Sequence, residues 1–102
     1  MTYEEAEGWA TLADPTRRSI LMELAEGERT VSELTATVPV SQPAVSQHLK
    51  VLRHVGLVSD RAMGTKRIYR LNEAGVVALR DQLDTFWKRA MSRFEELMEE
   101  DR

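Results

Sequence analysis

Between Ser41 and Gly56, apolar residues recur three and four positions apart, which is the spacing of one face of an α-helix. Both ends of this segment also favour a helix. Ser41 is a good N-cap, Pro43 falls in the first turn, where its missing N–H costs nothing, and Gly56 can end the helix. The pattern therefore predicts an amphipathic helix. Its apolar face comprises Val45, Leu49, Leu52 and Val55.

The opposite face of the same helix is polar and contains no carboxylate. Its residues are Pro43, Ser46, Gln47, Lys50, Arg53 and His54, with Gln42 at the edge. The absence of acids is informative because the whole chain has 17 acidic residues. Amides and cations read base edges in the major groove of DNA, whereas carboxylates repel the phosphates. We therefore interpret this face as a DNA-reading surface.

The segments before this helix also follow helical spacing. They predict a short first helix and a second helix that begins after Asp14-Pro15, an N-cap followed by proline at the first helical position. Thr30 and Glu33 are spaced as a capping box for a short third helix, which the next proline ends. A short helix, a tight break and a longer amphipathic helix predict a helix-turn-helix over residues 30–56.

The pattern changes after the amphipathic helix. Two runs of strand-forming residues flank a turn that contains Gly64, which predicts a β-hairpin over residues 57–71. A hairpin in this place is a wing. Arg61, Lys66 and Arg67 lie at its tip and flanks, and we expect them to contact DNA phosphates or the adjacent minor groove.

The longest helical pattern follows Asn72, a candidate N-cap, and covers residues 73–100. At about 1.5 Å per residue this helix is roughly 40 Å long, which is more than so small a domain can cover. Its apolar stripe continues along the whole length and requires a partner helix. We expect it to pair with the first helix, residues 3–13, and with its counterpart in a second chain. The expected interface residues are Trp9, Leu12, Leu83, Phe86, Trp87, Ala90 and Phe94.

Length and composition fit a single domain over residues 1–102, because 42% of the residues are hydrophobic, which is enough for a core. The predicted elements make this domain mainly α-helical with a two-stranded β-hairpin. The chain has no cysteine, which excludes disulfides and thiolate metal sites and fits a reducing compartment. No apolar run is long enough to span a membrane, and the acidic N-terminus does not have the pattern of a signal peptide. We therefore expect a cytoplasmic protein with no membrane partner.

Charge is distributed unevenly along the chain. Residues 1–40 carry eight acids and three bases, and residues 71–102 carry eight acids and five bases. Residues 41–70 carry six bases and a single acid, Asp60, so that their net charge is +5 although the whole chain has −3. A basic middle segment between acidic flanks is typical of a DNA-facing surface on an acidic protein.

Four motifs together resemble an ArsR-type winged helix-turn-helix repressor. They are LADPTRRSILMEL (Leu12–Leu24), SELT from Ser32, SQPAVSQHLKVLRHVGLV (Ser41–Val58) and the wing ending IYRL (Ile68–Leu71). The similarity extends from residue 9 to about residue 90, with the motifs in the family's order. It implies a homodimer with the first and last helices at the interface, which represses transcription by occupying an operator. It also implies that DNA is read mainly by the start of the amphipathic helix, at Gln42, Pro43, Ser46 and Gln47.

One departure from the family concerns metal. Metal-sensing members carry a cysteine pair in the third helix, and here Thr30 and Ser32 stand in those places. Other members place aspartate and histidine ligands on the last helix, where this chain has Asp81 and Asp84 but no histidine. Two isolated carboxylates are weak ligands for zinc or softer metals. We therefore expect no metal site and no cofactor.

Catalysis is not indicated. The chain has no phosphate-binding glycine loop, no cysteine nucleophile and no paired carboxylates in an apolar setting, so we expect that it is not an enzyme. Two alternatives to a repressor stay open. One is a winged helix that binds proteins rather than DNA, and the other is a sensor on the same fold that a metal or small molecule gates.

The expected DNA-binding residues are Gln42, Pro43, Ser46, Gln47, Lys50, Arg61, Lys66 and Arg67. Gln47 can make two hydrogen bonds to adenine, and Lys50 can reach guanine or a phosphate. The roles of three other residues stay open. His48 lies near the apolar side of its helix, where packing competes with base reading, and Arg17 and Arg18 can either touch phosphate or pair with nearby acids.

Overall fold

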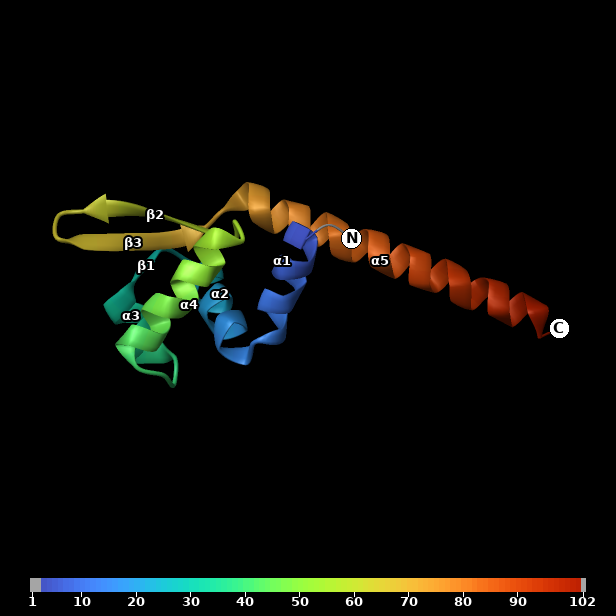
Figure 1. Cartoon of the computed structure of the whole chain (residues 1–102), viewed down its shortest axis with the longest axis horizontal. Coiled ribbons are helices and arrows are strands. Elements are labelled where there is room, and N and C mark those ends of the chain that lie inside the picture. The colour runs from blue at the N-terminus through green and yellow to red at the C-terminus, as the bar shows by residue number, and fades with distance from the viewer. Residues whose placement is uncertain (1–2, 102) are drawn as a thin grey trace.

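The computed structural model describes the backbone of residues 3–101 and the side chains of residues 6–101. Five helices and three strands follow one another along the chain (Figure 1). The helices are α1 (Tyr3–Ala13), α2 (Pro15–Glu26), α3 (Val31–Thr37), α4 (Gln42–His54) and α5 (Glu73–Glu100). The strands are β1 (Arg29–Thr30), β2 (Val58–Met63) and β3 (Lys66–Leu71). This order is that of a winged helix-turn-helix, with α3 and α4 as the two helices and β2–β3 as the wing.

The sequence signals for the starts of three helices are confirmed. The side chain of Asp14 accepts a hydrogen bond from the backbone N–H of Arg17 at 3.1 Å, at the start of α2. Thr30 and Glu33 form the reciprocal capping box of α3. Ser41 accepts from the N–H of Ala44 and caps α4. Each cap satisfies an N–H that the helix itself leaves without a partner.

The core lies where α2, α3 and α4 meet the base of the wing. Its buried residues are Ile20, Leu24, Leu34, Val38, Val45, Leu49, Leu52, Leu57 and Val58. Three of the four residues on the predicted apolar face of α4 belong to it, and the fourth, Val55, is half-buried and packs against it. The apolar face of α4 is therefore covered by the chain's own α2, α3 and wing, and the helix is held with its polar face outward.

The sheet has three strands, whereas the sequence predicted two. In addition to the expected hairpin, the two-residue strand β1 pairs antiparallel with β3, with Arg29 opposite Tyr69 and Thr30 opposite Ile68. Within the hairpin, Asp60 lies opposite Tyr69 and Met63 opposite Lys66, and the turn between the strands contains Gly64 at φ +61°. The added strand joins the base of the wing to the start of α3.

The start of α5 is anchored to the end of α4. Gly56, at φ +83°, ends α4, and its carbonyl accepts a hydrogen bond from the Asn72 side chain at 2.9 Å. Asn72 precedes α5 as predicted, but its side chain makes no capping hydrogen bond with that helix. A Cβ built on Gly75 would lie 1.8 Å from the Gly56 carbonyl oxygen, so only glycine allows this approach.

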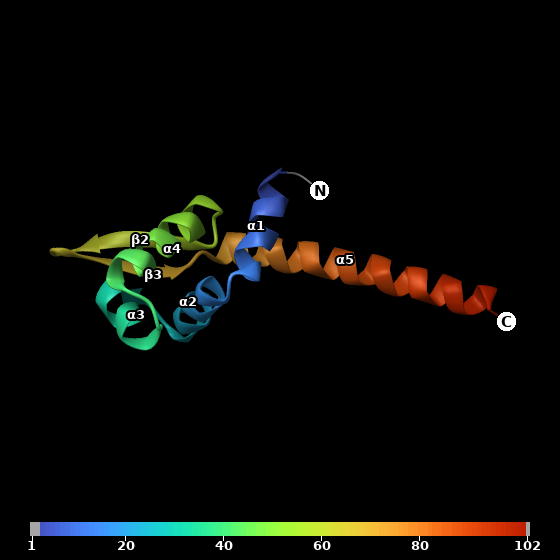
Figure 2. The same cartoon turned by 60° about the horizontal axis from the view of Figure 1, so that its bottom comes forward.

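Helix α5 projects from the rest of the molecule. In Figures 1 and 2 its C-terminal half runs away from the other elements, on the side opposite the tip of the wing. The molecule is accordingly long and narrow, 65 × 25 × 24 Å. Of the helices that the structure describes, none combines the length and the apolar composition needed to cross a bilayer.

Candidate nucleic-acid interface

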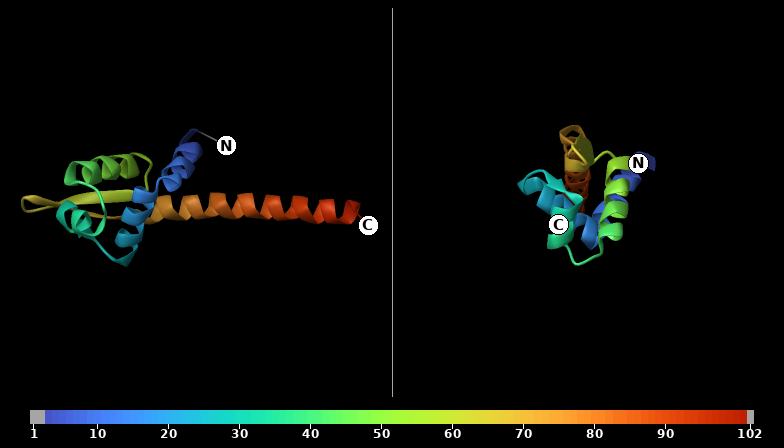
Figure 3. Two further views of the ribbon diagram at one scale, coloured as in Figure 1. Left: turned by 90° about the horizontal axis from the view of Figure 1, so that it is seen from below. Right: turned by 90° about the vertical axis from the view of Figure 1, so that its left-hand side faces the viewer.

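The outer face of α4 carries the predicted DNA-reading residues in an open position. The side chains of Gln42, Pro43, Ser46, Gln47 and Lys50 are all exposed, whereas those of Val45 and Leu49 on the opposite face are fully buried. When the molecule is seen along its long axis from the wing end, α4 lies on one flank, with α3 on the other side of the wing (Figure 3, right). A helix held by its apolar face in this way can present its polar side chains to a groove of DNA.

His48 and the two arginines of α2 have structural partners. Arg17 Nε donates a hydrogen bond to His48 Nδ1 at 3.1 Å, which joins α2 to α4. Arg18 donates to the carbonyl of Leu12 at 2.6 Å and so satisfies an acceptor near the end of α1. These contacts favour the structural interpretation of all three residues.

The wing cations differ in how they are held. Arg67 Nε donates to Asp60 at 2.6 Å, and Arg61 Nη2 donates to Glu28 at 2.7 Å. Lys66 forms no ion pair with any of residues 6–101. Of the three cations that we expect at the phosphates, Lys66 is therefore the one without a carboxylate partner in the described part of the chain.

Asp60 pairs with basic residues of the candidate surface, a role that the sequence interpretation missed. Its side chain is only 8% exposed and accepts from Arg67 on β3 and, at 3.4 Å, from Arg53 on α4. The hydrogen bond from Arg67 holds the pKa of the Asp60 carboxyl below its ordinary value, against the opposing effect of burial. This carboxylate joins the wing to α4. It is the only acid between residues 41 and 70, a signal that could have identified it.

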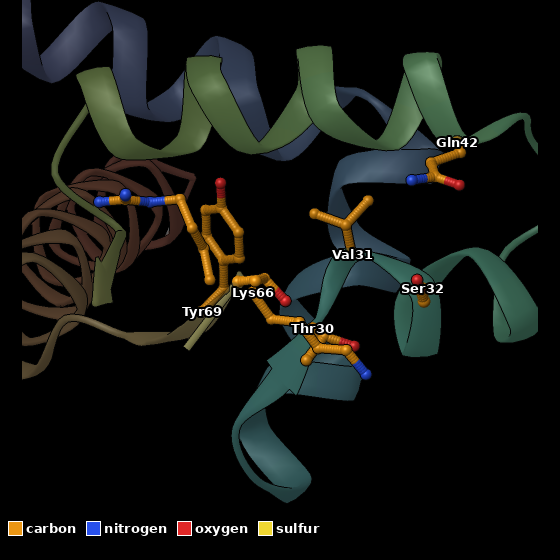
Figure 4. A pocket seen from close by; sticks show the side chains of 8 residues that line it. Thr30, Val31, Ser32, Gln42, Lys66 and Tyr69 are labelled. Atoms are coloured by element: carbon orange, nitrogen blue, oxygen red, sulfur yellow. The ribbon is translucent and has the colours of Figure 1, made fainter. Parts of the chain in front are cut away.

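An open pocket of about 240 Å³ separates the start of α4 from the wing. Its lining residues are Thr30, Val31, Ser32, Gln42, Thr65, Lys66, Arg67 and Tyr69. Figure 4 shows Gln42 and Ser32 at one end, Tyr69 and Lys66 at the other, and Val31 between them. The fold therefore brings one predicted residue of α4 and two of the wing to the same concave surface, although they are 24 residues or more apart in the chain.

Helices α1 and α5 meet through aromatic side chains. Trp9 contacts Phe86 edge-to-face at 5.4 Å between ring centroids, and its indole N–H donates to Gln82 at 3.2 Å. Phe86 in turn contacts Trp87 at 5.3 Å. The Trp87 side chain is nevertheless 58% exposed and that of Phe94 54% exposed. Leu12, Leu83 and Ala90 are half-buried. Intramolecular packing thus leaves much of the predicted interface uncovered.

Metal ligands do not converge in the part of the chain that the structure describes. No group of three or more histidine, aspartate or glutamate side chains there is placed to hold an ion. At the positions of the family's thiolate ligands, Thr30 has its hydroxyl engaged in capping α3, and Ser32 is exposed. Hydroxyl groups of this kind do not fit a soft metal.

Comparison of the sequence with known proteins identifies bacterial transcriptional regulators as its relatives. Residues 14–60 match the family model described as "Bacterial regulatory protein, arsR family". The chain is 50% identical over 99 residues to the HTH-type transcriptional regulator Rv2034 of Mycobacterium tuberculosis, an alignment that covers 96% of this chain and 92% of that protein. It is 45% identical over 60 residues to the HTH-type transcriptional repressor SmtB of the same species, but this covers 59% of the chain and only 44% of SmtB.

Solved structures agree with these sequence matches. An ArsR-like transcriptional regulator from Rhodococcus sp. RHA1 superposes with a TM-score of 0.78 at 31% identity, and the alignment covers 97% of each chain. The transcriptional repressor BigR from Xylella fastidiosa superposes with a TM-score of 0.64 at 38% identity, covering 79% of this chain and 83% of that one. The similarity therefore extends beyond the helix-turn-helix to the helices that flank it.

Proposed function

This chain belongs to the arsR family of bacterial regulatory proteins, and from this premise we propose that it is a homodimeric, DNA-binding repressor of transcription. Relatives in the family are named transcriptional regulators and repressors rather than enzymes. The observation that carries the proposal is the outer face of α4, which is exposed, polar and free of carboxylates on a helix whose other face is buried. A regulator of this kind acts in the cytoplasm, where the DNA is.

The proposed reading of DNA assigns a role to each exposed residue. Helix α4 enters the major groove, where Gln47 bonds an adenine edge and Lys50 a guanine or a phosphate. Gln42, Pro43 and Ser46 at the start of α4 approach the bases and backbone. The cations of the wing, Arg61, Lys66 and Arg67, hold the phosphates beside the site.

The proposed dimer uses the surface that α1 and α5 leave uncovered. None of the 28 residues of α5, all of which the structure describes, is buried. Its exposed apolar side chains continue to the far end of the helix, where Leu97 is 39% and Met98 67% exposed. An apolar stripe of this length can be buried if it packs against the same stripe of a second chain, related by a two-fold axis. Two recognition helices related in this way read an inverted repeat, with roughly one helical turn of DNA between the half-site centres.

A titration of labelled DNA tests this proposal. The probe is duplex from the region upstream of the chain's own reading frame, and the readout is fluorescence anisotropy at low salt. We expect saturable binding that weakens steeply as salt is added, because phosphate contacts release counterions.

A matched pair of variants keeps this test specific. Gln47→Ala removes a side chain from the outer face of α4, whereas Thr85→Ala changes an exposed residue of α5 that lies off its apolar stripe. We expect weaker binding from the first variant and unchanged binding from the second. A flat titration of the wild-type protein at low salt, on this duplex and on duplexes selected from a random pool, contradicts the proposed function.

A further inference from the structure

The two ion-paired arginines of the wing are held by different nitrogens. Arg67 is held through Nε, so its two terminal nitrogens stay available for a further acceptor. Arg61 is held through the terminal nitrogen Nη2, one of the groups that would otherwise contact a phosphate. The carboxylate of Asp60 therefore orients Arg67, whereas the carboxylate of Glu28 occupies the contacting end of Arg61.

The two carboxylates also differ in exposure. The Asp60 side chain is 8% exposed and is shared by two arginines, while the Glu28 side chain is 40% exposed and has one partner. The arginines are about equally exposed, so Glu28 is the carboxylate of the two that lies in contact with solvent and within reach of a competing anion. An exposed pair of this kind contributes little free energy, so that a phosphate can displace the carboxylate.

The register of the sheet shows the direction in which the Arg61 side chain extends. Arg61 on β2 lies opposite Ile68 on β3, and Ile68 lies opposite Thr30 on β1. Glu28 lies just before β1, on the far side of β3 from β2. The ion pair therefore spans the width of β3, and the Arg61 side chain extends across β3 towards the start of β1.

We propose that Glu28 masks Arg61, acting as an internal substitute for a DNA phosphate, and thereby limits the affinity of the wing for duplex of any sequence. This inference rests on the proposed function, because the competing anion is the DNA backbone. When the protein binds, a phosphate takes the place of the Glu28 carboxylate on Nη2 of Arg61, while Arg67 keeps its bond to Asp60. When the Glu28 charge is removed, Arg61 has no ion pair to lose before a DNA phosphate can bind it.

The test is a double-mutant cycle with a labelled duplex of arbitrary sequence. Glu28→Gln should tighten binding about two- to five-fold at low salt, which is the range that loss of an exposed ion pair allows. Glu26→Gln is the matched control, since Glu26 is also exposed and acidic, lies two residues away and forms no ion pair with the described residues. In the Arg61→Gln background, Glu28→Gln should have no effect.

Three results would overturn the inference. Glu28→Gln and Glu26→Gln could tighten binding equally, which would show a general effect of net charge. The gain from Glu28→Gln could persist in the Arg61→Gln background, which would exclude Arg61 as the mediator. Glu28→Gln could also leave affinity unchanged. In all three cases the wild-type protein still binds DNA and the proposed function stands, whereas a wild-type protein that binds neither this duplex nor a selected one contradicts the proposed function itself.

Discussion

Helices α4 and α5 are both amphipathic, but the apolar face of α4 is buried within the chain whereas that of α5 is largely exposed. Val45, Leu49 and Leu52 of α4 are fully buried by α2, α3 and the wing. No residue of α5 is buried, and its aromatic and methionine side chains face solvent over most of its length. The same helical period thus produces one helix that completes a core and another that projects from it.

This difference shows what each helix offers to a partner. Because α4 buries its apolar face within the chain, what it presents outward is polar and suits the grooves of DNA. Because α5 leaves much of its apolar face uncovered, the surface that it presents outward suits a second protein chain. Variants of the two helices should therefore affect different properties of the protein.

The largest effect is expected in the buried face of α4. Leu49→Ala removes a fully buried side chain and should lower the free energy of unfolding by about 2–5 kcal/mol, because it leaves a cavity. Lys50→Ala at the exposed neighbouring position should change it by less than about 0.5 kcal/mol. Urea denaturation followed by circular dichroism, at one fixed protein concentration, measures both. Equal effects of the two variants would mean that α4 is not oriented as described.

The next effect concerns the exposed face of α5. Trp87→Ala should weaken the proposed dimer by about 2 kcal/mol or more, because a large aromatic side chain that becomes buried between chains is a typical hot spot. Thr85→Ala, an exposed position on the same helix, should leave the dimer unchanged. Sedimentation equilibrium measures the dissociation constant. A wild-type protein that is monomeric at all accessible concentrations would contradict the role assigned to α5.

A smaller effect is expected on the polar face of α4. Gln47→Ala should weaken binding to the preferred DNA site by about 1–3 kcal/mol and relax the preference at one base position in each half-site. Its stability in urea should equal that of the wild type, since the Gln47 side chain is exposed. Competition titrations with single-base variants of the site provide the measurement. Uniform weakening on every sequence would assign Gln47 to the backbone instead.

The wing should affect binding without affecting sequence preference. Lys66→Ala removes a cation with no carboxylate partner among the described residues, and should reduce the dependence of log K on log salt by about 0.9. Arg67→Ala should also lower this slope. Titrations at a series of salt concentrations measure it. Slopes that both variants leave unchanged would contradict the placement of the wing on phosphates.

The smallest effect concerns the ion pairs of Asp60, which connect α4 to the wing. Arg67 holds the pKa of Asp60 below its ordinary value of 3.8, so Asp60 stabilises the fold above that pH and the contribution is lost as the pH falls through its lowered pKa. The difference in unfolding free energy between wild type and Asp60→Asn should thus be constant above about pH 5 and shrink as the pH falls below about 4. Asp84→Asn, at an exposed position without an ion pair to residues 6–101, is the control. A difference that does not vary with pH would exclude the ion pairs of Asp60 as its cause.

Local signals in the sequence predicted most of the fold. The N-cap at Asp14, the capping box at Thr30 and the N-cap at Ser41 each act within three residues, and each is present in the structure. The buried face of α4 followed from its period alone. What the sequence could not predict depends on partners far along the chain. Strand β1 is two residues long, too short to have a period, and exists through its pairing with β3.

The candidate site shows the same limit. The exposed positions of Gln42, Ser46 and Gln47 could be predicted because they follow from the helical period. The ion pairs of Arg61 and Arg67 could not be predicted, since several acids lie within reach of a flexible arginine before the fold is known. Glu28 and Arg61 are 33 residues apart, and only the sheet brings them together.

The division of roles between α4 and α5 is tested most directly by selecting bound duplexes from a random pool with the full chain. We expect enrichment of an inverted repeat whose half-site centres are about 10 base pairs apart, which requires both a DNA-reading α4 and a dimer held by α5. The same selection with Gln47→Ala should lose one base preference in each half. A pool that shows no enrichment, or the same enriched sequence with Gln47→Ala as with the wild type, would contradict this account.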